Sequence, residues 1–572
     1  MKNEKTATGA KYSPLFTKIL QARGIGLESA ADFLQPVYEK LNAPDDLPDV
    51  AVAVARIWRA IKNNEKILVF GDYDADGITA TAVLVRGLRH LGAKVVWDLP
   101  ERTTDGYGLP MRILETMPKD VKLVITVDCG SRDLAVVQKL KEQGVDVIIT
   151  DHHEVGQEKG ADGVLRDVLP EAVAVVNPKR ADSNYPFRDL AGVGVAFQLV
   201  RAVASDGWTK WLLDLVAVGT VCDQVPLLGD NRILVQYGLK VMPKTKWAGL
   251  QELTKDVKKL DAYALAFRVG PKINASGRLE SPRLALELLL EDNKPRAAEL
   301  AQKLNKLNDL RKKKQEKALA ELEVTLGVKN GLTGVENDKI LIVSGKWEEG
   351  LIGLIAGKLV EQYGKPAFVW TETSEKIKCS ARSFGEFSCA EAIGRLRELG
   401  LIEKGGGHAA AGGASAPKAN FAAIKKALNE YYDELGLQNQ ARFLREQADA
   451  TVEDFAELDL ALWQELQSLA PFGQGNAEPV LRLRGRLCEK RTMGKNNEHV
   501  CLMVAEKMRS ANGERRQFSF CAWGGAKKWG TLACWGEAPE MGEYDFDFRA
   551  IYSDYGDEHL EGQVINITRA SD

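Results

Sequence analysis

From about residue 51, short runs of β-branched and other apolar residues alternate with stretches whose apolar residues recur at helical spacing. Two of these helical stretches are 79–91 and 132–144. The expected strands are 66–70, 93–99, 122–127, 145–150 and 172–176. Strands that alternate with helices of this length build βαβ units, so we expect an α/β domain with a parallel, doubly wound sheet.

The remainder of the 572 residues is long enough for further domains. Helical patterns dominate after about residue 190 and end in an amphipathic stretch that runs into the basic segment 311–323. A second α/β pattern begins near Lys339, and short alternating strands after about residue 479 predict a small β-barrel or sandwich. We therefore expect an N-terminal extension (1–50), the parallel-sheet domain (51–240), a helical connector (241–325), a smaller α/β domain (326–435) and a β domain (450–572).

Composition narrows the class of protein. Lys and Arg number 77 against 80 Asp and Glu, a formal charge of −3, so bulk charge gives no argument for a polyanionic ligand. The start of the chain has no apolar stretch of the kind that exports or anchors a protein. The eight cysteines, which fit a reducing compartment because they show no metal or disulfide spacing, are Cys129, Cys222, Cys379, Cys389, Cys488, Cys501, Cys521 and Cys534. We expect a cytoplasmic protein without a membrane span.

Acids and imidazoles follow the expected strands. These residues are Asp72, Asp74 and Asp76 after the first strand, Asp128 after the third, Asp151, His152 and His153 after the fourth, and Asp223 after a later apolar stretch. Ligands of an open parallel sheet bind at the carboxyl ends of its strands, where these side chains should converge. Clustered carboxylates repel one another unless a cation neutralises them. Oxygen ligands with one or two imidazoles suit Mn²⁺ or Mg²⁺, and two ions could hold both oxygens of a phosphoryl displacement.

Each motif alone has an ordinary structural interpretation. The first, D-x-D-x-D-G, could be a solvated loop or a calcium loop, although it lacks the distal Glu of an EF-hand. Asp128 alone would more often be a helix N-cap. The set is more specific than any one of its members, so a metal site is the leading hypothesis.

These residues carry a resemblance to a known family. GDYDADG (71–77), VDCG (127–130), TDHHE (150–154) and GTVCDQVPL (219–227) resemble motifs one to four of the DHH phosphoesterase superfamily. The further motifs PERTTDGYGL, GPKINASGRL, KCSARSFGEFS, GGGHAAAGG and PFGQGNAEPV resemble its RecJ branch of single-strand-specific 5′→3′ exonucleases. The resemblance implies that the three main domains are a DHH domain, a DHH-associated domain and an OB-like barrel.

The resemblance also implies roles for individual residues. The implied ligands of two Mn²⁺ or Mg²⁺ ions are Asp74, Asp76, Asp128 as the bridging carboxylate, His152 and Asp223; Asp72 and His153 lie close to the metals, and His153 is implied to take part in catalysis. The positions implied to hold the 5′ phosphate and backbone are Arg102, Arg278, Ser380, Arg382, Gly407 and His408. In the β domain, the alternating Arg482, Arg484 and Arg486 share one strand face, where they could track a single strand or simply protect a sheet edge.

The implied activity is two-metal hydrolysis of single-stranded DNA from the 5′ end, releasing 5′-mononucleotides in recombination and repair. A helicase and a single-strand-binding protein are candidate partners of a monomer. Two alternatives stay open: a DHH phosphodiesterase acting on short oligonucleotides or cyclic dinucleotides, and an inactive binding subunit. One departure stands out, because Glu348 occupies the position of the His in the W-H-x-G that RecJ-like sequences usually show.

Overall fold

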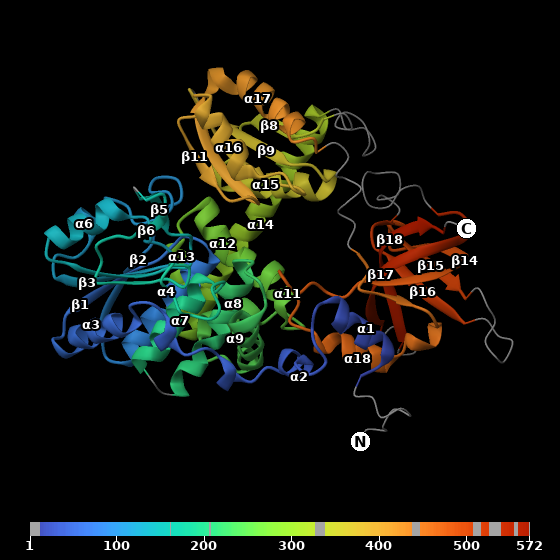
Figure 1. The fold of residues 1–572 in the computed structure, drawn as a ribbon, viewed down its shortest axis with the longest axis horizontal. Helices are drawn as coiled ribbons and strands as arrows, with labels where there is room; N and C mark the ends of the chain where they lie inside the picture. Colours follow the sequence, from blue (N-terminus) through green and yellow to red (C-terminus); the bar gives the residue numbers. More distant parts are fainter. Residues whose placement is uncertain are drawn as a thin grey trace. The chain divides into compact units, whose positions relative to one another are not determined.

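The computed structural model divides the chain into two compact units (Figure 1). It describes residues 12–160, 162–204, 207–326, 338–373, 375–437, 447–506, 516–525, 539–553 and 559–570. The parallel-sheet unit comprises Pro36–Lys313 and Pro471–Ala477. The two-sheet unit comprises Met1–Gln35, Lys314–Ala470 and Glu478–Asp572. Cys534 and most of the stretch between the expected smaller α/β domain (326–435) and the expected β domain (450–572) lie outside the described residues.

The parallel-sheet unit is built on five strands in the order β2-β1-β3-β4-β7, and every pairing is parallel. The strands are β1 (Lys66–Phe70), β2 (Lys94–Asp98), β3 (Val121–Val127), β4 (Asp146–Thr150) and β7 (Ala174–Val176). Each lies within one residue of an expected strand or inside it. The α/β prediction for this part of the chain is confirmed.

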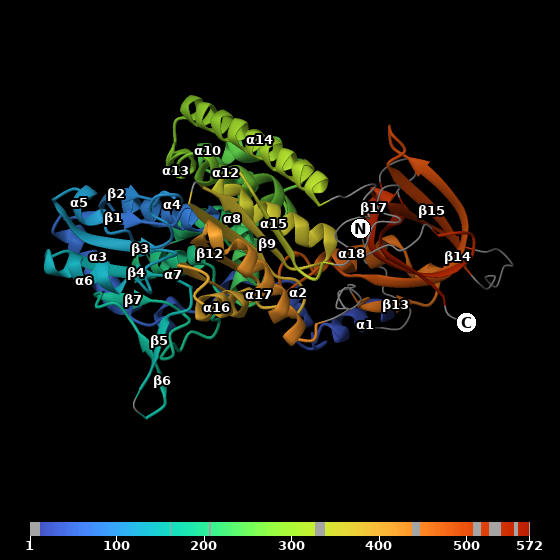
Figure 2. The same cartoon turned by 90° about the horizontal axis from the view of Figure 1, so that it is seen from above.

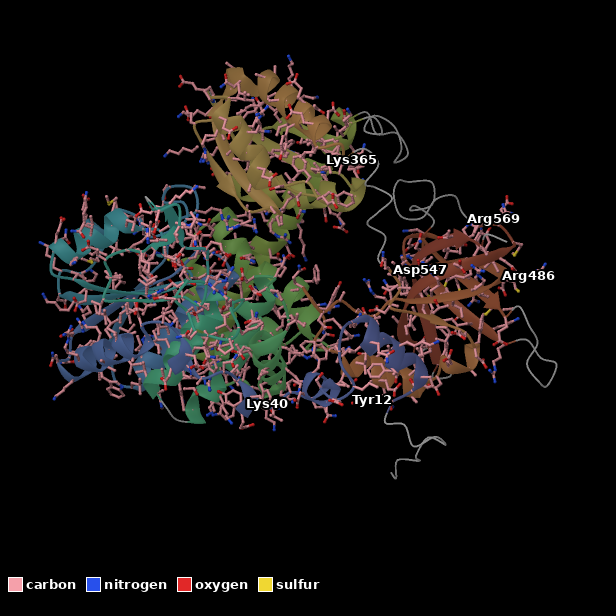
Figure 3. All side chains as sticks on the ribbon, viewed as in Figure 1. Tyr12, Lys40, Lys365, Arg486, Asp547 and Arg569 are labelled. Carbon is pink, nitrogen blue, oxygen red and sulfur yellow. The ribbon has the colours of Figure 1, made fainter. Side chains whose placement is uncertain are left out.

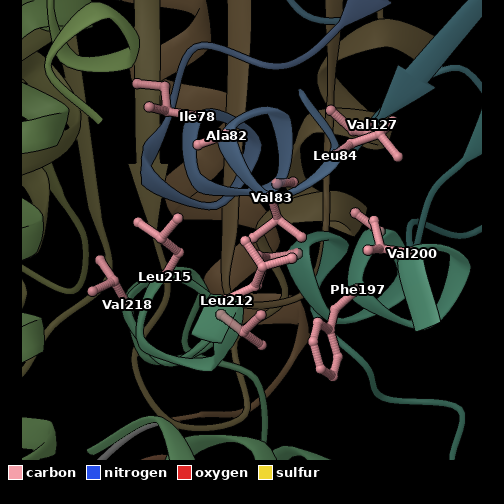
Figure 4. Packing of buried hydrophobic residues seen from close by; sticks show 14 of the residues in the cluster. Ile78, Ala82, Val83, Leu84, Val127, Phe197, Val200, Leu212, Leu215 and Val218 are labelled. Atoms are coloured by element: carbon pink, nitrogen blue, oxygen red, sulfur yellow. The ribbon is translucent and has the colours of Figure 1, made fainter. Parts of the chain in front are cut away.

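Alternate residues of the strands face different helices. Ile67, Val69 and Ile125 belong to one buried cluster, whereas Leu68 and Val124 belong to another. Figure 4 shows the first cluster, where Val83 of α4, Phe197 of α7 and Leu215 of α8 come together. Because helices cover both faces, the strands are apolar throughout rather than alternating.

The helices of this unit, with α14 continuing into the other, are α3 (Val50–Lys62), α4 (Ala75–His90), α5 (Ile113–Thr116), α6 (Leu134–Glu142), α7 (Gly192–Ala204), α8 (Leu213–Cys222), α9 (Gly229–Val241), α10 (Ala248–Thr254), α11 (Ala262–Ala264), α12 (Gly270–Leu279), α13 (Arg283–Leu290) and α14 (Lys294–Thr325). A π-helical turn, Leu265–Val269, joins α11 to α12. The 32-residue α14 confirms the expected long connecting helix.

Two features of this unit have no counterpart in the sequence predictions. The hairpin of β5 (Gly156–Lys159) and β6 (Leu165–Val168) projects from the body of the unit (Figure 2). Residues 471–477, which the sequence pattern placed with the β domain, pack instead with the parallel-sheet unit, where Leu227 N donates to Gln474 O at 2.8 Å.

The two-sheet unit contains a smaller α/β domain. Its sheet has the order β11-β12-β10-β9-β8, with β8 and β9 parallel and the other pairs antiparallel. The elements are β8 (Leu341–Gly345), α15 (Glu349–Tyr363), β9 (Ala367–Glu372), β10 (Lys376–Arg382), α16 (Cys389–Glu398), β11 (Lys404–Gly407), β12 (Ala411–Pro417) and α17 (Phe421–Glu434). Helices α16 and α17 cover one face, and α15 contacts β9 and β10.

The C-terminal domain is a closed barrel. Its strands follow the order β14-β15-β16-β18-β17, and β14 also pairs with β17, which closes the sheet. The elements are β13 (Ala450–Val452), α18 (Leu460–Ser468), β14 (Leu481–Met493), β15 (His499–Ala505), β16 (Gln517–Ala522), β17 (Glu543–Ser553) and β18 (His559–Arg569). This arrangement confirms the expected β-barrel. Two short N-terminal helices, α1 (Pro14–Ala22) and α2 (Ala30–Leu34), belong to the same unit, and α1 contacts β13.

None of the helices in the described part of the chain is long and apolar enough to cross a membrane.

Candidate functional site

The acids expected at the carboxyl edge of the parallel sheet do converge there. β1 runs into the loop that carries Asp72 and Asp74, and Asp74 forms the N-cap of α4. Asp74 Oδ1 accepts hydrogen bonds from Asp76 N at 2.9 Å and Gly77 N at 3.1 Å. This N-cap satisfies donors that the first helical turn leaves without partners, and it aims the acidic loop at the strand ends.

Asp76 is held by a second helix. Its carboxylate accepts from Gly192 N at 2.7 Å and from Val193 N at 2.9 Å, the first amides of α7. The positive end of a helix stabilises a negative charge, so α7 offsets part of the cost of burying Asp76. A Cβ on Gly219 of α8 would lie 2.8 Å from Asp76 Oδ1, which explains the glycine there.

Asp128 follows β3 in a left-handed conformation, with φ of 61°. Its amide donates to Thr150 O at 2.9 Å, which ties this turn to the end of β4. A Cβ on Gly192 would lie 2.7 Å from Asp128 Cβ, so only glycine leaves room for this side chain. The strained backbone therefore presents a carboxylate at the centre of the cluster.

The imidazoles of the DHH motif reach the same point. His152 Nε2 lies 3.1 Å from Asp128 Oδ1, 3.7 Å from Asp223 Oδ2 and 4.0 Å from Asp76 Oδ2. His153 Nδ1 lies 3.9 Å from Asp128 Oδ1. Asp223 stands at the C-cap of the mostly apolar, buried helix α8, whose burial fixes the position of that residue.

Three overlapping groups of these side chains could each hold a cation. They are Asp76, His152 and Asp223; Asp72, Asp74 and Asp128; and Asp128, His152 and His153. Asp72 Oδ1, Asp128 Oδ1 and His152 Nε2 are buried, and within the described part of the chain they have no hydrogen-bond partner. Buried polar atoms without partners are rare, and this oxygen-rich donor set with imidazole fits Mn²⁺ or Mg²⁺.

The pKa values of the clustered carboxylates also indicate a cation site. Burial raises the pKa of Asp76, Asp128 and Asp223, and the neighbouring carboxylates raise it further. The pKa of Asp72 is raised by burial and by Asp74. Such a cluster resists full ionisation unless a cation enters, so the site is suited to bind positive charge.

Two residues orient His153: Asp151, which was expected at this edge of the sheet but without a role of its own, and Tyr107, which the sequence did not single out. Buried Asp151 accepts from His153 Nδ1 at 2.9 Å and from Ser131 N at 3.0 Å. Burial would raise the pKa of Asp151, but the hydrogen bond and charge of His153 lower it overall, so the carboxylate is ionised and the proton resides on Nδ1. Tyr107 OH lies 2.8 Å from the same nitrogen and donates to Asp128 O at 3.2 Å. The adjacent D of the DHH motif was the available signal.

Arg102 and Arg278 were expected near the substrate phosphates. The Arg102 guanidinium stacks on the Tyr73 ring, with Cζ 3.9 Å from the ring centroid. Arg278 is half-buried in the last turn of α12, and both arginines lower the raised pKa of Tyr73 electrostatically. Helix α12 also docks on the acidic loop, because Asn274 Oδ1 accepts from Ala75 N at 2.9 Å. The two cations therefore lie beside the loop that carries Asp72 and Asp74.

The other expected phosphate-binding residues lie in the two-sheet unit. Ser380 and Arg382 share one face of β10, and Arg382 Nη1 donates to Ser380 Oγ at 3.3 Å. A Cβ on Gly353 of α15 would lie 3.0 Å from Ser380 Oγ. Gly407 ends β11 with φ of 155°, and His408 N donates to Ala411 O at 2.8 Å in the turn that follows.

The three arginines of β14 differ in their environments. Arg482 makes a bidentate pair with Asp547 at 2.7 and 3.0 Å, and Arg484 makes one with Asp545 at 2.7 and 2.8 Å. Arg486 is exposed further along β14 (Figure 3). Aspartates of β17 therefore already use two of the three guanidinium groups.

Glu348, the departure from the usual pattern, is paired as well. Its Oε1 lies 2.5 Å from Lys314 Nζ of α14. The neighbouring Trp347 Nε1 donates to Glu321 Oε2 at 3.3 Å, also on α14. The carboxylate thus helps to dock the connecting helix on the α/β domain, and its charge is partly neutralised.

The sequence matches three domain families, one after another along the chain. The DHH family, N-terminal domain, matches residues 66–220; the DHHA1 domain matches 337–434; and the RecJ OB domain matches 449–538. The crystal structure of RecJ in complex with Mn²⁺ from Thermus thermophilus is 28% identical with a TM-score of 0.78, covering 98% of this chain and 77% of that one. The Mg²⁺ complex from the same source gives a TM-score of 0.73, at 27% identity and with coverage of 98% and 76%.

Curated relatives agree with these matches. A single-stranded-DNA-specific exonuclease RecJ of Bacillus subtilis is 34% identical over 507 residues, which are 86% of this chain but 61% of the relative's length. Its namesake in Escherichia coli is 32% identical over 528 residues, covering 86% of this chain and 87% of the relative. The chain therefore belongs to the RecJ family of single-stranded-DNA-specific exonucleases within the DHH superfamily.

Proposed function

We propose that this chain is a metal-dependent exonuclease that hydrolyses single-stranded DNA from the 5′ end and releases 5′-mononucleotides, acting in recombination and repair. The observation that carries the proposal is the buried cluster in which Asp128 and His152 face each other at 3.1 Å without a hydrogen bond. Paired with family membership, this cluster favours an active nuclease over a binding subunit that has lost its metal ligands.

Asp74, Asp76, Asp128, His152 and Asp223 would hold two divalent cations, Mn²⁺ or Mg²⁺, with Asp128 shared between them. When bound, such cations supply Lewis-acid chemistry, because they lower the pKa of water and neutralise negative charge that develops on a phosphate. Asp72 and His153 line the same site. The proton on His153 Nδ1 leaves Nε2 of that ring to interact with substrate.

The cationic residues would bind the phosphates of the DNA strand rather than take part in the hydrolysis itself. Arg102, fixed by its stacking on Tyr73, and Arg278 on α12 would bind phosphates beside the metal cluster. Ser380, Arg382, Gly407 and His408 would hold the terminal phosphate. In the barrel, exposed Arg486 is the best-placed of the three arginines, whereas Arg482 and Arg484 would have to exchange Asp547 and Asp545 for phosphate.

Degradation of end-labelled strands tests this proposal. With Mn²⁺, the wild-type protein should release mononucleotides from the 5′ end of single strands and leave duplexes intact. Asp128→Asn should lower the rate at least about 1000-fold because it removes the shared carboxylate. Asp120→Asn replaces an exposed acid that is paired with Lys66 in the same unit, and it should leave the rate unchanged. Release from the 3′ end, or full activity of Asp128→Asn, would contradict the proposal.

Thermal unfolding provides a readout that does not depend on activity. Mn²⁺ should raise the unfolding temperature of the wild-type protein and of Asp120→Asn, because a ligand that binds only the folded state stabilises it. The increase should be lost in Asp128→Asn. An equal increase in all three proteins would place the metal elsewhere.

We further propose that the protein acts as a cytoplasmic monomer, with a helicase and a single-strand-binding protein supplying and presenting its substrate. An enzyme restricted to single strands depends on other proteins to unwind duplex DNA. Light scattering of the purified chain tests the monomer, and stimulation of duplex degradation by an added helicase tests the partnership.

A further inference from the structure

We infer that Tyr263 and Phe267 form a stacking platform for the bases of a single-stranded nucleic acid. This inference rests on the proposed function, and it extends the binding surface beyond the metal cluster. The platform is defined by these two rings together with Arg268.

The two rings are exposed and adjacent. Tyr263 is 63% exposed and Phe267 65%, and they are the two most exposed aromatic side chains in the described part of the chain. They lie four residues apart on one helical run, with ring centroids 4.7 Å apart and planes inclined at 35°. Together they present a continuous aromatic surface that the protein's own core leaves uncovered.

This helical run continues directly into the candidate active site. The π-helical turn Leu265–Val269 carries Phe267 and passes without a break into α12. Its Leu265 carbonyl accepts from Cys222 Sγ at 3.8 Å, next to Asp223, and Gly270 packs closely against the same sulfur. Asn274 and Gly277, further along, contact the acidic loop at Ala75 and Tyr73. π turns are often found at functional sites, and this one joins the platform to the helix that contacts the acidic loop.

The charge beside the rings suits phosphate. Arg268 is exposed on the same turn as Phe267. Lys272, one turn on, has Lys255 and Lys312 among the charges around it, together with Asp256 and Asp309. Stacking surfaces with a neighbouring arginine are typical of proteins that bind single strands without reading their sequence.

The length of helix fixes which nucleotides reach the platform. Seven residues separate Phe267 from Asn274 and ten separate it from Gly277, which at about 1.5 Å per residue is roughly 10–15 Å. At about 3.4 Å per nucleotide along a stacked strand, this corresponds to roughly three to four nucleotides. A dinucleotide held at the cluster would not reach the rings, whereas a 12-nucleotide strand would.

Steady-state hydrolysis of a dinucleotide and of a 12-nucleotide strand tests the platform. Tyr263→Ala and Phe267→Ala should each raise KM on the longer strand about 5- to 100-fold, with kcat changed little, since base stacking on a ring contributes on the order of this factor. Their kinetics on the dinucleotide should stay within about twofold of wild type. Phe267→Trp should retain binding, and Phe267→Leu, which keeps the apolar surface but lacks a ring, should behave like Phe267→Ala.

Trp58→Ala is the matched control, because Trp58 is an exposed ring on α3 of the same unit and should not change either substrate's kinetics. Wild-type KM for the Ala variants on the long strand would overturn the platform. Retained binding by Phe267→Leu would also overturn it, in favour of an apolar surface for a protein. If the wild-type protein hydrolyses neither substrate, the proposed function fails, and anisotropy of a labelled 12-nucleotide strand with the same variants still decides the platform.

Discussion

At the scale of single residues, Asp151 sets the orientation and the tautomer of the His153 imidazole. The carboxylate accepts from His153 Nδ1 at 2.9 Å, from His152 N at 2.8 Å and from Ser131 N at 3.0 Å. In Asp151→Asn one acceptor oxygen becomes an NH₂ group, which favours the wrong tautomer of the imidazole. We expect kcat to fall about 10- to 100-fold, the usual cost of losing a group that orients a functional histidine, and the pH profile of kcat to shift.

A role of Asp151 in folding alone would give a different result. Asp151→Asn would then lower the unfolding temperature of the metal-free protein, while the folded fraction kept its kcat and pH profile. Unfolding and kinetics measured on the same preparation separate the two explanations.

Asp214, which lies outside the metal cluster, should make the free energy of unfolding depend on pH. Burial raises its pKa to about 6 in spite of hydrogen bonds from Leu215 N and Trp247 Nε1. The folded protein thus binds a proton more tightly than the unfolded chain does, so the stability that Asp214 contributes is complete below pH 4 and is lost as pH rises through about 6. The rise from 3.8 to about 6 corresponds to about 3 kcal/mol.

Asp214→Asn does not titrate, so its stability relative to wild type should increase between pH 4 and pH 7. Urea unfolding of both proteins at several pH values measures the difference. An equal pH dependence in the two proteins would mean that Asp214 stays ionised in the folded state.

The acids at the strand ends could be predicted from the sequence because a parallel sheet places all its carboxyl ends at one edge. Asp74, Asp128 and His152 needed only that rule and the strand pattern. Tyr107 could not be predicted, because its contact with His153 depends on the path of the irregular loop after β2. The partners of Arg482 and Arg484 were also hidden, since the pairing register of β14 with β17 sets them.

At the scale of elements, the start of α7 is shaped around the cluster. Gly192 N donates a hydrogen bond to the Asp76 carboxylate. Because Gly192 has no Cβ, it also leaves room for the Asp128 side chain. In Gly192→Ala the new methyl group would collide with Asp128 and displace it. We expect at least a 100-fold loss of Mn²⁺-dependent hydrolysis and a smaller rise of the unfolding temperature with Mn²⁺.

Gly357→Ala in α15 is the matched control, because a Cβ there has no atom within 4 Å. The replacement of glycine in a helix should stabilise that helix by up to about 1 kcal/mol and leave activity unchanged. If Gly192→Ala behaved like Gly357→Ala, the contact between α7 and Asp128 would not matter for the site.

The strands of the parallel sheet were predictable because they are buried on both faces and read as apolar runs. β5 and β6 were not, because Gly156–Lys159 and Leu165–Val168 are mostly exposed and lack the alternation that marks a half-buried strand. The periodicity of apolar residues in a sequence arises from burial. An exposed hairpin therefore shows no clear periodic pattern.

At the scale of the whole molecule, the chain returns to the parallel-sheet unit after it has begun the barrel domain. Residues 471–477 lie between α18 and β14 in sequence, yet Gln474 O accepts from Leu227 N, four residues after Asp223. Motif similarity marked this segment, but apolar periodicity could not assign it to a unit, because it forms no strand or helix of its own. We infer that the segment holds the loop that presents Asp223.

Gly475→Ala tests this inference. Gly475 has φ of 71°, and a Cβ would lie 3.0 Å from Pro226 Cβ, so the change adds about 1 kcal/mol of backbone strain and pushes on the Asp223 loop. Gly436→Ala carries similar strain at φ of 65° but has no atom within 4 Å of the new Cβ. We expect Gly475→Ala to weaken Mn²⁺ binding several-fold, read as a smaller metal-induced rise in unfolding temperature, and Gly436→Ala to leave it unchanged. Equal effects would show that strain alone acts, and that the returning segment does not support the metal cluster.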